Sequence, residues 1–129
     1  MRKGVILFLL CCCFIVQFSY AENVKVGPVD LQEWDFGQVK QGAILKHDFV
    51  LKNETNEILE INNVHTSCGC TASESGKKSL LPQESTAIKV TFNSRGYLGL
   101  VTQFIYVNTD SIDLAIVKFT IKANVVKED

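Results

Sequence analysis

The last stretch of this chain alternates between apolar and polar side chains. Between residues 115 and 125 one parity is apolar throughout, and the other is mostly polar or charged. The apolar set is Ala115, Val117, Phe119, Ile121, Ala123 and Val125, and the opposite set includes Lys118, Thr120, Lys122 and Asn124. Because successive side chains of a strand point to opposite faces, this period of two predicts a β-strand with one buried face.

The same alternation, or a short apolar run, recurs along the chain, and no segment after residue 22 shows helical spacing. Clusters of Gly, Asn, Ser and Pro separate these segments and predict turns. Gly37 is expected to end the first strand, and residues 73–79 are expected to form a polar loop. The pattern predicts an all-β fold, an immunoglobulin-like antiparallel β-sandwich of about seven strands, with a closed barrel as a weaker alternative. The earlier predicted strands are residues 29–36, 43–53, 58–64, 85–92 and 101–107.

The amino-terminal segment has the three parts of a secretory signal. Arg2 and Lys3 form a basic start, residues 5–16 are apolar, and Ser19 and Ala21 are small residues at the positions that a signal peptidase reads. The apolar run is shorter than the roughly 20 residues of a membrane span. Lipidation at Cys11 or Cys13, or retention as an uncleaved anchor, are weaker alternatives. The predicted organisation is a signal peptide, residues 1–21, and one domain, residues 22–129.

Removal of this signal changes the charge and the cysteine content. The 13 Lys and Arg fall to 11 without Arg2 and Lys3, against 14 Asp and Glu, so the exported chain carries about −3. A weakly acidic domain without a basic stripe argues against nucleic acid as a partner. Only Cys68 and Cys70 remain after cleavage. We expect the exported domain in an oxidising compartment, either the periplasm or the cell surface and exterior. We expect no membrane insertion once the signal is cleaved.

The segment Cys68-Gly69-Cys70 allows three interpretations. The first is structural, a half-buried pair or a local disulfide, which Gly69 helps to close by letting the backbone bend. The second is a soft-metal site, in which His65 joins the two thiolates to hold Cu(I) or Zn(II). The third is a redox-active dithiol, which needs a nearby positive charge to lower a thiol pKa. Lys77 and Lys78 are too far along the chain to supply that charge.

No other residues assemble into a catalytic motif. The chain lacks a nucleophile elbow and a phosphate-binding glycine loop, and its second histidine, His47, shares parity with Phe49 and is expected at the core edge. Trp34 and Phe36 are expected in the core, whereas an exposed Trp34 would indicate a partner surface. We therefore expect no enzyme and no required cofactor.

The order of several motifs resembles a known family. These motifs are Asp35-Phe36-Gly37, Phe49 with Lys52-Asn53, Ser67-Cys68-Gly69-Cys70-Thr71, Pro82-Gln83-Glu84 with Val90-Thr91-Phe92, Gly99 and Val107-Asn108. In the order of these motifs, residues 29–125 resemble the bacterial exported family called domain of unknown function 1573. Members of that family look like immunoglobulin-type sandwiches. Gln83 departs from the family, which usually has glycine there. The resemblance implies a fold and a compartment, but no mechanism.

Taken together, these observations predict an exported, non-enzymatic module that binds an unidentified protein of the cell envelope or has a structural role there. Sandwich domains often bind partners by adding a strand to an exposed sheet edge. The alternative is a metal-binding or thiol-redox role through Cys68 and Cys70.

Overall fold

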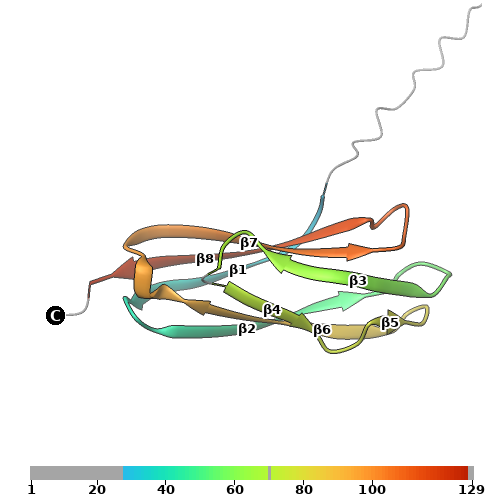
Figure 1. Ribbon diagram of the computed structural model, residues 1–129, viewed down its shortest axis with the longest axis horizontal. Coiled ribbons are helices and arrows are strands. Elements are labelled where there is room, and N and C mark those ends of the chain that lie inside the picture. Colours follow the sequence, from blue (N-terminus) through green and yellow to red (C-terminus); the bar gives the residue numbers. More distant parts are fainter. Residues whose placement is uncertain (1–27, 70, 128–129) are drawn as a thin grey trace, which may run out of the picture.

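Two β-sheets packed face to face make up the part of the chain that the computed structural model describes, residues 28–69 and 71–127 (Figure 1). The five-stranded sheet has the order β1-β8-β7-β3-β5, and the three-stranded sheet has the order β2-β6-β4. The elements are β1 (Val29–Lys40), β2 (Ile44–Lys52), β3 (Leu59–Thr66), β4 (Thr71–Ser75), β5 (Ser79–Leu80), β6 (Ser85–Asn93), the 3-10 helix η1 (Ser94–Gly96), β7 (Gly99–Thr109) and β8 (Ile116–Val126). The predicted all-β sandwich is confirmed. The predicted signal, residues 1–21, lies outside the described residues, as does Cys70.

The first strand differs from the prediction in two ways. β1 pairs with β8 in parallel, whereas the other strand pairs in the described part of the chain are antiparallel. In addition, Gly37 does not end the strand. Gly37 takes a φ of +71°, and its N–H donates to the Asp35 side chain at 2.7 Å. The register shifts between Asp35 and Gln38, so the glycine forms a bulge and the strand continues to Lys40.

The expectation of a polar loop over residues 73–79 was wrong, because β4 occupies part of it. β4 pairs with β6 from Thr71, opposite Phe92, to Ser75, opposite Ile88. Its inward-facing positions carry Thr71, Ser73 and Ser75, which are buried or half-buried despite being polar. The strand therefore has no apolar row, and periodicity could not reveal it. Among the described residues, no helix has the length and the apolar character needed to cross a membrane.

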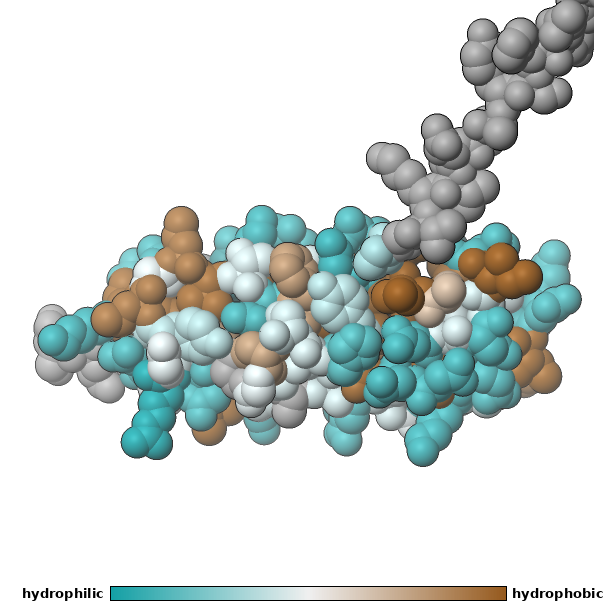
Figure 2. All heavy atoms as spheres, turned by 45° about the horizontal axis from the view of Figure 1, so that its top comes forward, coloured by the Kyte–Doolittle hydropathy of each residue, from teal (hydrophilic) through white to brown (hydrophobic). Residues whose placement is uncertain are grey.

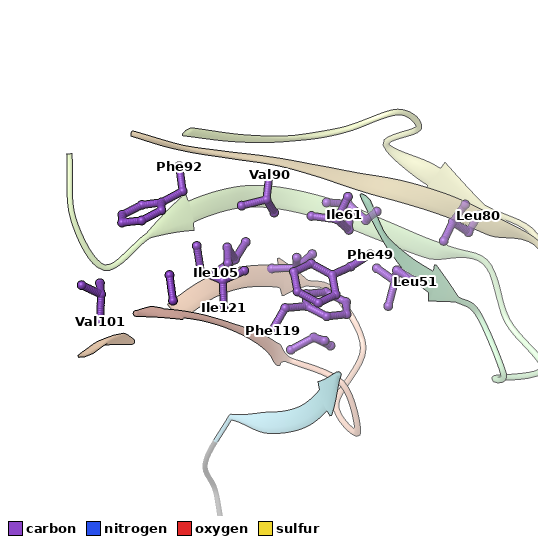
Figure 3. Close-up of a cluster of buried hydrophobic side chains, with 14 of the residues drawn as sticks. Phe49, Leu51, Ile61, Leu80, Val90, Phe92, Val101, Ile105, Phe119 and Ile121 are labelled. Atoms are coloured by element: carbon purple, nitrogen blue, oxygen red, sulfur yellow. The ribbon is translucent and has the colours of Figure 1, made fainter. Parts of the chain in front are cut away.

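The core lies between the two sheets, where the apolar rows predicted from the sequence face one another (Figure 3). Phe49 of β2 and Phe119 of β8 stack across the interface, with ring centroids 4.8 Å apart. Both side chains are at most 1% exposed. Burial of such a side chain stabilises a fold by roughly 1.5–3 kcal/mol relative to leaving it in water. Further members from both sheets are Leu51, Val90, Phe92, Ile105, Val117 and Ile121.

Replacing Gln83 by glycine is expected to raise the free energy of unfolding by about 0.5–1 kcal/mol. Gln83 takes a φ of +69° in the turn between β5 and β6, a left-handed conformation that a residue with a Cβ rarely adopts. Glycine adopts it without a steric cost, although it loses more backbone entropy on folding. Urea unfolding of the wild type and Gln83→Gly measures the difference.

The matched control is Gln38→Gly, the same chemical change at an exposed strand position whose φ is not positive. At Gln38 only the entropic cost of glycine remains, so Gln38→Gly should lower the free energy of unfolding by about 0.5–1 kcal/mol. If both substitutions destabilised the protein to the same extent, the left-handed strain at Gln83 would be ruled out.

Candidate functional site

Cys68 lies in the connection between β3 and β4, where it is half-buried. It is disulfide-bonded. Because Cys68 is the only cysteine among residues 28–69 and 71–127, its partner is outside the described part of the chain. Cys70 is outside it as well, so a bond between these two cysteines stays a prediction.

Hydrogen bonds hold the backbone around Cys68. The Thr66 hydroxyl lies 2.8 Å from the carbonyl oxygens of both Cys68 and Thr71 and shares its hydrogen between them. On the other side, the Ser67 N–H donates to the Phe104 carbonyl at 2.9 Å. The Ser67 hydroxyl accepts from the Phe104 N–H at 3.0 Å. The connection is thus tied to β7, which limits the positions that the Cys68 sulfur can take.

Tyr97 is the functional neighbour that the sequence did not reveal. Its hydroxyl donates a hydrogen bond to Cys68 Sγ at 3.4 Å, although the two residues are 29 positions apart. The Tyr97 ring packs on Phe92, with centroids 5.5 Å apart, and its N–H donates to the Ser94 carbonyl at 3.1 Å. Tyr97 follows η1 in a turn between strands, where no periodic pattern distinguishes it. Only the folded chain brings it to the cysteine.

The 3-10 helix η1 anchors this neighbourhood. Ser94 is fully buried, and its hydroxyl lies 2.9 Å from the Lys40 carbonyl and 3.0 Å from that of Ala43. The Asn93 side chain accepts from the Arg95 N–H at 3.0 Å. These hydrogen bonds fix the position of η1, and η1 in turn positions Tyr97 next to Cys68.

Gly69, which follows Cys68 in the chain, lines an open hollow of about 720 Å³. Arg95 contributes a positive charge to its lining, and Asn93 and Tyr97 contribute polar groups. A cation close to a thiol favours the thiolate, but Cys68 itself is not among the residues that line this hollow. Lys77, which was expected to be too far along the chain to supply such a charge, forms an ion pair with Glu84 at 3.4 Å.

His65 lies on the outer face of the five-stranded sheet. It is exposed and stacks on Tyr106, its cross-strand partner on β7, with ring centroids 5.2 Å apart. Within residues 28–69 and 71–127, no three His, Cys, Asp or Glu side chains form a group that could hold a metal ion. Cys70 lies outside these residues, so a copper or zinc site of Cys68, Cys70 and His65 remains a prediction.

A second aromatic cluster joins β1 to β2. His47 stacks on Trp34, with ring centroids 4.3 Å apart and planes 8° from parallel, and meets Phe49 edge-on at 4.6 Å. His47 is half-buried, which agrees with its expected place at the core edge. The expectation that Trp34 is a core residue was wrong, because 44% of it is exposed. The exposed indole instead matches the alternative of a partner surface.

Acidification should destabilise the fold through His47. Burial lowers the pKa of His47 below its ordinary value of 6.5 because it penalises the charged ring, and neighbouring Asp48 only partly opposes this. The unfolded state then binds more protons, so the free energy of unfolding falls as the pH drops through 6.5 and levels off below the lowered pKa. Urea unfolding between about pH 5 and 8 should show this fall in the wild type relative to His47→Gln. If the free energies of unfolding of the wild type and His47→Gln changed equally with pH, this role of His47 would be contradicted.

Solved structures resemble the fold at low sequence identity. A protein of unknown function from Porphyromonas gingivalis W83 matches with a TM-score of 0.63 and 16% identity, over 71% of this chain and 43% of that one. The Vibrio cholerae VesB protease matches with a TM-score of 0.63 and 14% identity, over 72% of this chain and 30% of that one. This chain therefore spans less than half the length of either protein.

This chain covers a larger share of a human domain with a similar fold. The ASH/PapD-like domain 7 of human CEP192 matches with a TM-score of 0.52 and 14% identity, over 75% of this chain and 82% of that domain. At such identity the likeness concerns the fold, and it agrees with the predicted immunoglobulin-like sandwich. No curated protein matches the sequence significantly. The family model described as "Protein of unknown function (DUF1573)" matches residues 28–125, nearly the whole described region, and the chain therefore belongs to that family.

Proposed function

We propose that this protein is an exported, non-enzymatic module that binds a partner protein of the cell envelope. The observation that carries the proposal is strand β1, the end strand of the five-stranded sheet, which exposes large apolar side chains. An end strand presents backbone N–H and C=O groups on its free side, so an extended segment of another protein adds to it by main-chain hydrogen bonds.

Two side chains of β1 supply specific contacts for such a segment. Leu31 is 42% exposed and Trp34 is 44% exposed. Trp34 is held in place by its stack on His47, so little side-chain entropy is lost when a partner covers it. Aromatic residues that are rigid and partly exposed are frequent anchors in protein interfaces.

Photo-crosslinking in cells tests this function. A benzoylphenylalanine placed at Leu31 is expected to give a light-dependent adduct of defined mass, and mass spectrometry then identifies the partner. The matched control is the same residue at Val50, which is apolar and 52% exposed. Val50 lies on β2, on the outer face of the other sheet, and should give no adduct. The absence of an adduct at Leu31 would overturn the proposal, and equal adducts at Leu31 and Val50 would contradict binding at β1.

A second candidate function, thiol–disulfide exchange at Cys68, is favoured by one contact. The Tyr97 hydroxyl that donates to Cys68 Sγ would stabilise the thiolate formed when the disulfide is reduced. Stabilising the reduced form makes a disulfide more oxidising. Gly69 and Tyr97, the chain neighbour and the hydrogen-bond donor of Cys68, line an open hollow through which an incoming thiol would approach. Cys70 is the bonding partner that the sequence offers once the signal is removed.

The reduction potential of the purified exported protein tests the exchange function. In glutathione buffers, Tyr97→Phe should lower the potential by about 10–30 mV, because a hydrogen bond of about 0.5–1.5 kcal/mol to the thiolate is lost. The control is Tyr106→Phe, which removes a hydroxyl from a tyrosine on the outer sheet face and should leave the potential unchanged. A wild-type potential below about −300 mV would make the disulfide structural. Titration of the reduced protein with Cu(I) and Zn(II) tests the metal alternative.

A further inference from the structure

Two neighbouring loops at one end of the sandwich expose isoleucine side chains. Ile58, between β2 and β3, is 54% exposed, and Ile112, between β7 and β8, is 97% exposed. Both line one hollow of about 400 Å³. Figure 2 shows apolar side chains at this right-hand end, next to hydrophilic ones. Because apolar groups that share an exposed site favour contact with another molecule, this end is a candidate interaction surface.

The charges around these isoleucines have one sign. Glu57, Asp110 and Asp113 line the same hollow, and no Lys or Arg does. None of these carboxylates belongs to a group of three that could hold a metal ion in the described part of the chain. An acidic rim around an apolar centre is complementary to a partner that carries positive charge around an apolar side chain.

Internal hydrogen bonds fix the loop that carries Ile112. The Thr109 hydroxyl donates to the Leu114 carbonyl at 2.7 Å and accepts from the Ser111 N–H at 3.1 Å. The loop is also tied to β3, since the Glu60 N–H donates to Asp110 Oδ1 at 2.9 Å. A loop that is ordered before binding loses little entropy when a partner covers it.

We propose that this loop end, defined as Glu57, Ile58, Asp110, Ile112 and Asp113, binds a basic protein segment with an apolar side chain between its Lys or Arg residues. The apolar side chain packs against the two isoleucines, and the basic groups pair with the carboxylates. The inference rests on the proposed function and goes beyond it by adding a second contact surface, apart from β1, and a class of partner. An anionic bilayer fits less well, because the carboxylates would repel it.

Binding of a defined peptide tests the surface. The probe is a synthetic peptide of alternating Lys and Leu, and its counterpart alternates Glu and Leu at the same length. In NMR titrations of the purified protein, the Lys-Leu peptide should shift the amide signals of residues 57–58 and 110–113, and the shifts should weaken as salt is added. The Glu-Leu peptide should not produce them.

Paired variants separate the apolar and the charged contributions. Ile112→Ser should weaken binding of the Lys-Leu peptide about tenfold. Leu100→Ser, at a residue that is 88% exposed at the start of β7, should change it less than twofold, as a roughly neutral control. Asp113→Lys should also weaken binding, whereas Asp48→Lys, an exposed charge reversal on β2, should not. All four positions are exposed, and circular dichroism checks that each variant folds.

Four results would overturn the inference. Equal effects of Ile112→Ser and Leu100→Ser would remove the loop end as the binding surface. Amide shifts that the Lys-Leu peptide induces only in β1 would also exclude the loop end as the binding surface. Binding to phosphatidylglycerol vesicles that depends on Ile112, without peptide binding, would make the surface a membrane contact. Cellular adducts at Leu31 combined with no effect of Ile112→Ser would leave the proposed function in place and remove this inference alone.

Discussion

Replacing Phe119 by alanine is expected to lower the free energy of unfolding by about 3–5 kcal/mol. Phe119 is 0% exposed, and its ring stacks on Phe49 of the facing sheet at 4.8 Å. The substitution removes the transfer energy of the ring and leaves a cavity that rigid neighbouring strands fill only in part. Since small domains are stable by only about 5–15 kcal/mol, the loss is a large share of the total. Urea unfolding followed by circular dichroism measures it.

An exposed apolar residue provides the control. Leu100→Ala truncates a side chain that is 88% exposed and should change the free energy of unfolding by less than about 0.5 kcal/mol. Phe49→Ala and the double variant add a further check, because the two rings share one contact. Their effects should not be additive, with a coupling of about 0.5–3 kcal/mol. Additive losses would show that the rings do not stack in solution.

The strands with an apolar row were predictable from the sequence, and Phe119 shows why. Its position in the alternation of β8 identifies the buried face without any knowledge of the partner sheet. β4 was missed because its inward positions carry Thr71, Ser73 and Ser75 rather than apolar residues. The parallel pairing of β1 with β8 was missed too, because alternation is the same in parallel and antiparallel strands.

The candidate sites depended still more on the fold. The sequence singled out Cys68, but its contact with Tyr97 joins two connections far apart in the chain. Likewise, nothing local indicates that Ile58 and Ile112 line one hollow. Both pairs arise because the fold brings together connections that are far apart in the chain, and residue spacing alone does not reveal such contacts. The turn at Gln83 is the reverse case, where a departure from the resembled family identified a strained residue.

Asn53 is a polar residue whose replacement should have an effect nearly as large as that of Phe119. Its side chain is 0% exposed. The amide Nδ2 donates to the Glu57 carbonyl at 2.8 Å and to the Leu80 carbonyl at 2.9 Å. Its Oδ1 accepts from the Thr55 N–H at 3.0 Å and from the Thr55 hydroxyl at 2.6 Å. One side chain thus ties the β2–β3 loop to β5, and its hydrogen-bonding capacity is fully used.

Asn53→Ala is expected to lower the free energy of unfolding by about 2–4 kcal/mol, because a buried group left without its partner costs about 1–3 kcal/mol. Asn56→Ala, at an exposed position of the same loop, should cost less than about 0.5 kcal/mol. Asn53→Ala should also loosen the loop that carries Ile58, so amide hydrogen exchange should rise at residues 54–58 while β8 stays protected. Equal stabilities of the two variants would contradict this account. Unchanged exchange in Asn53→Ala would show that other contacts hold the loop in place.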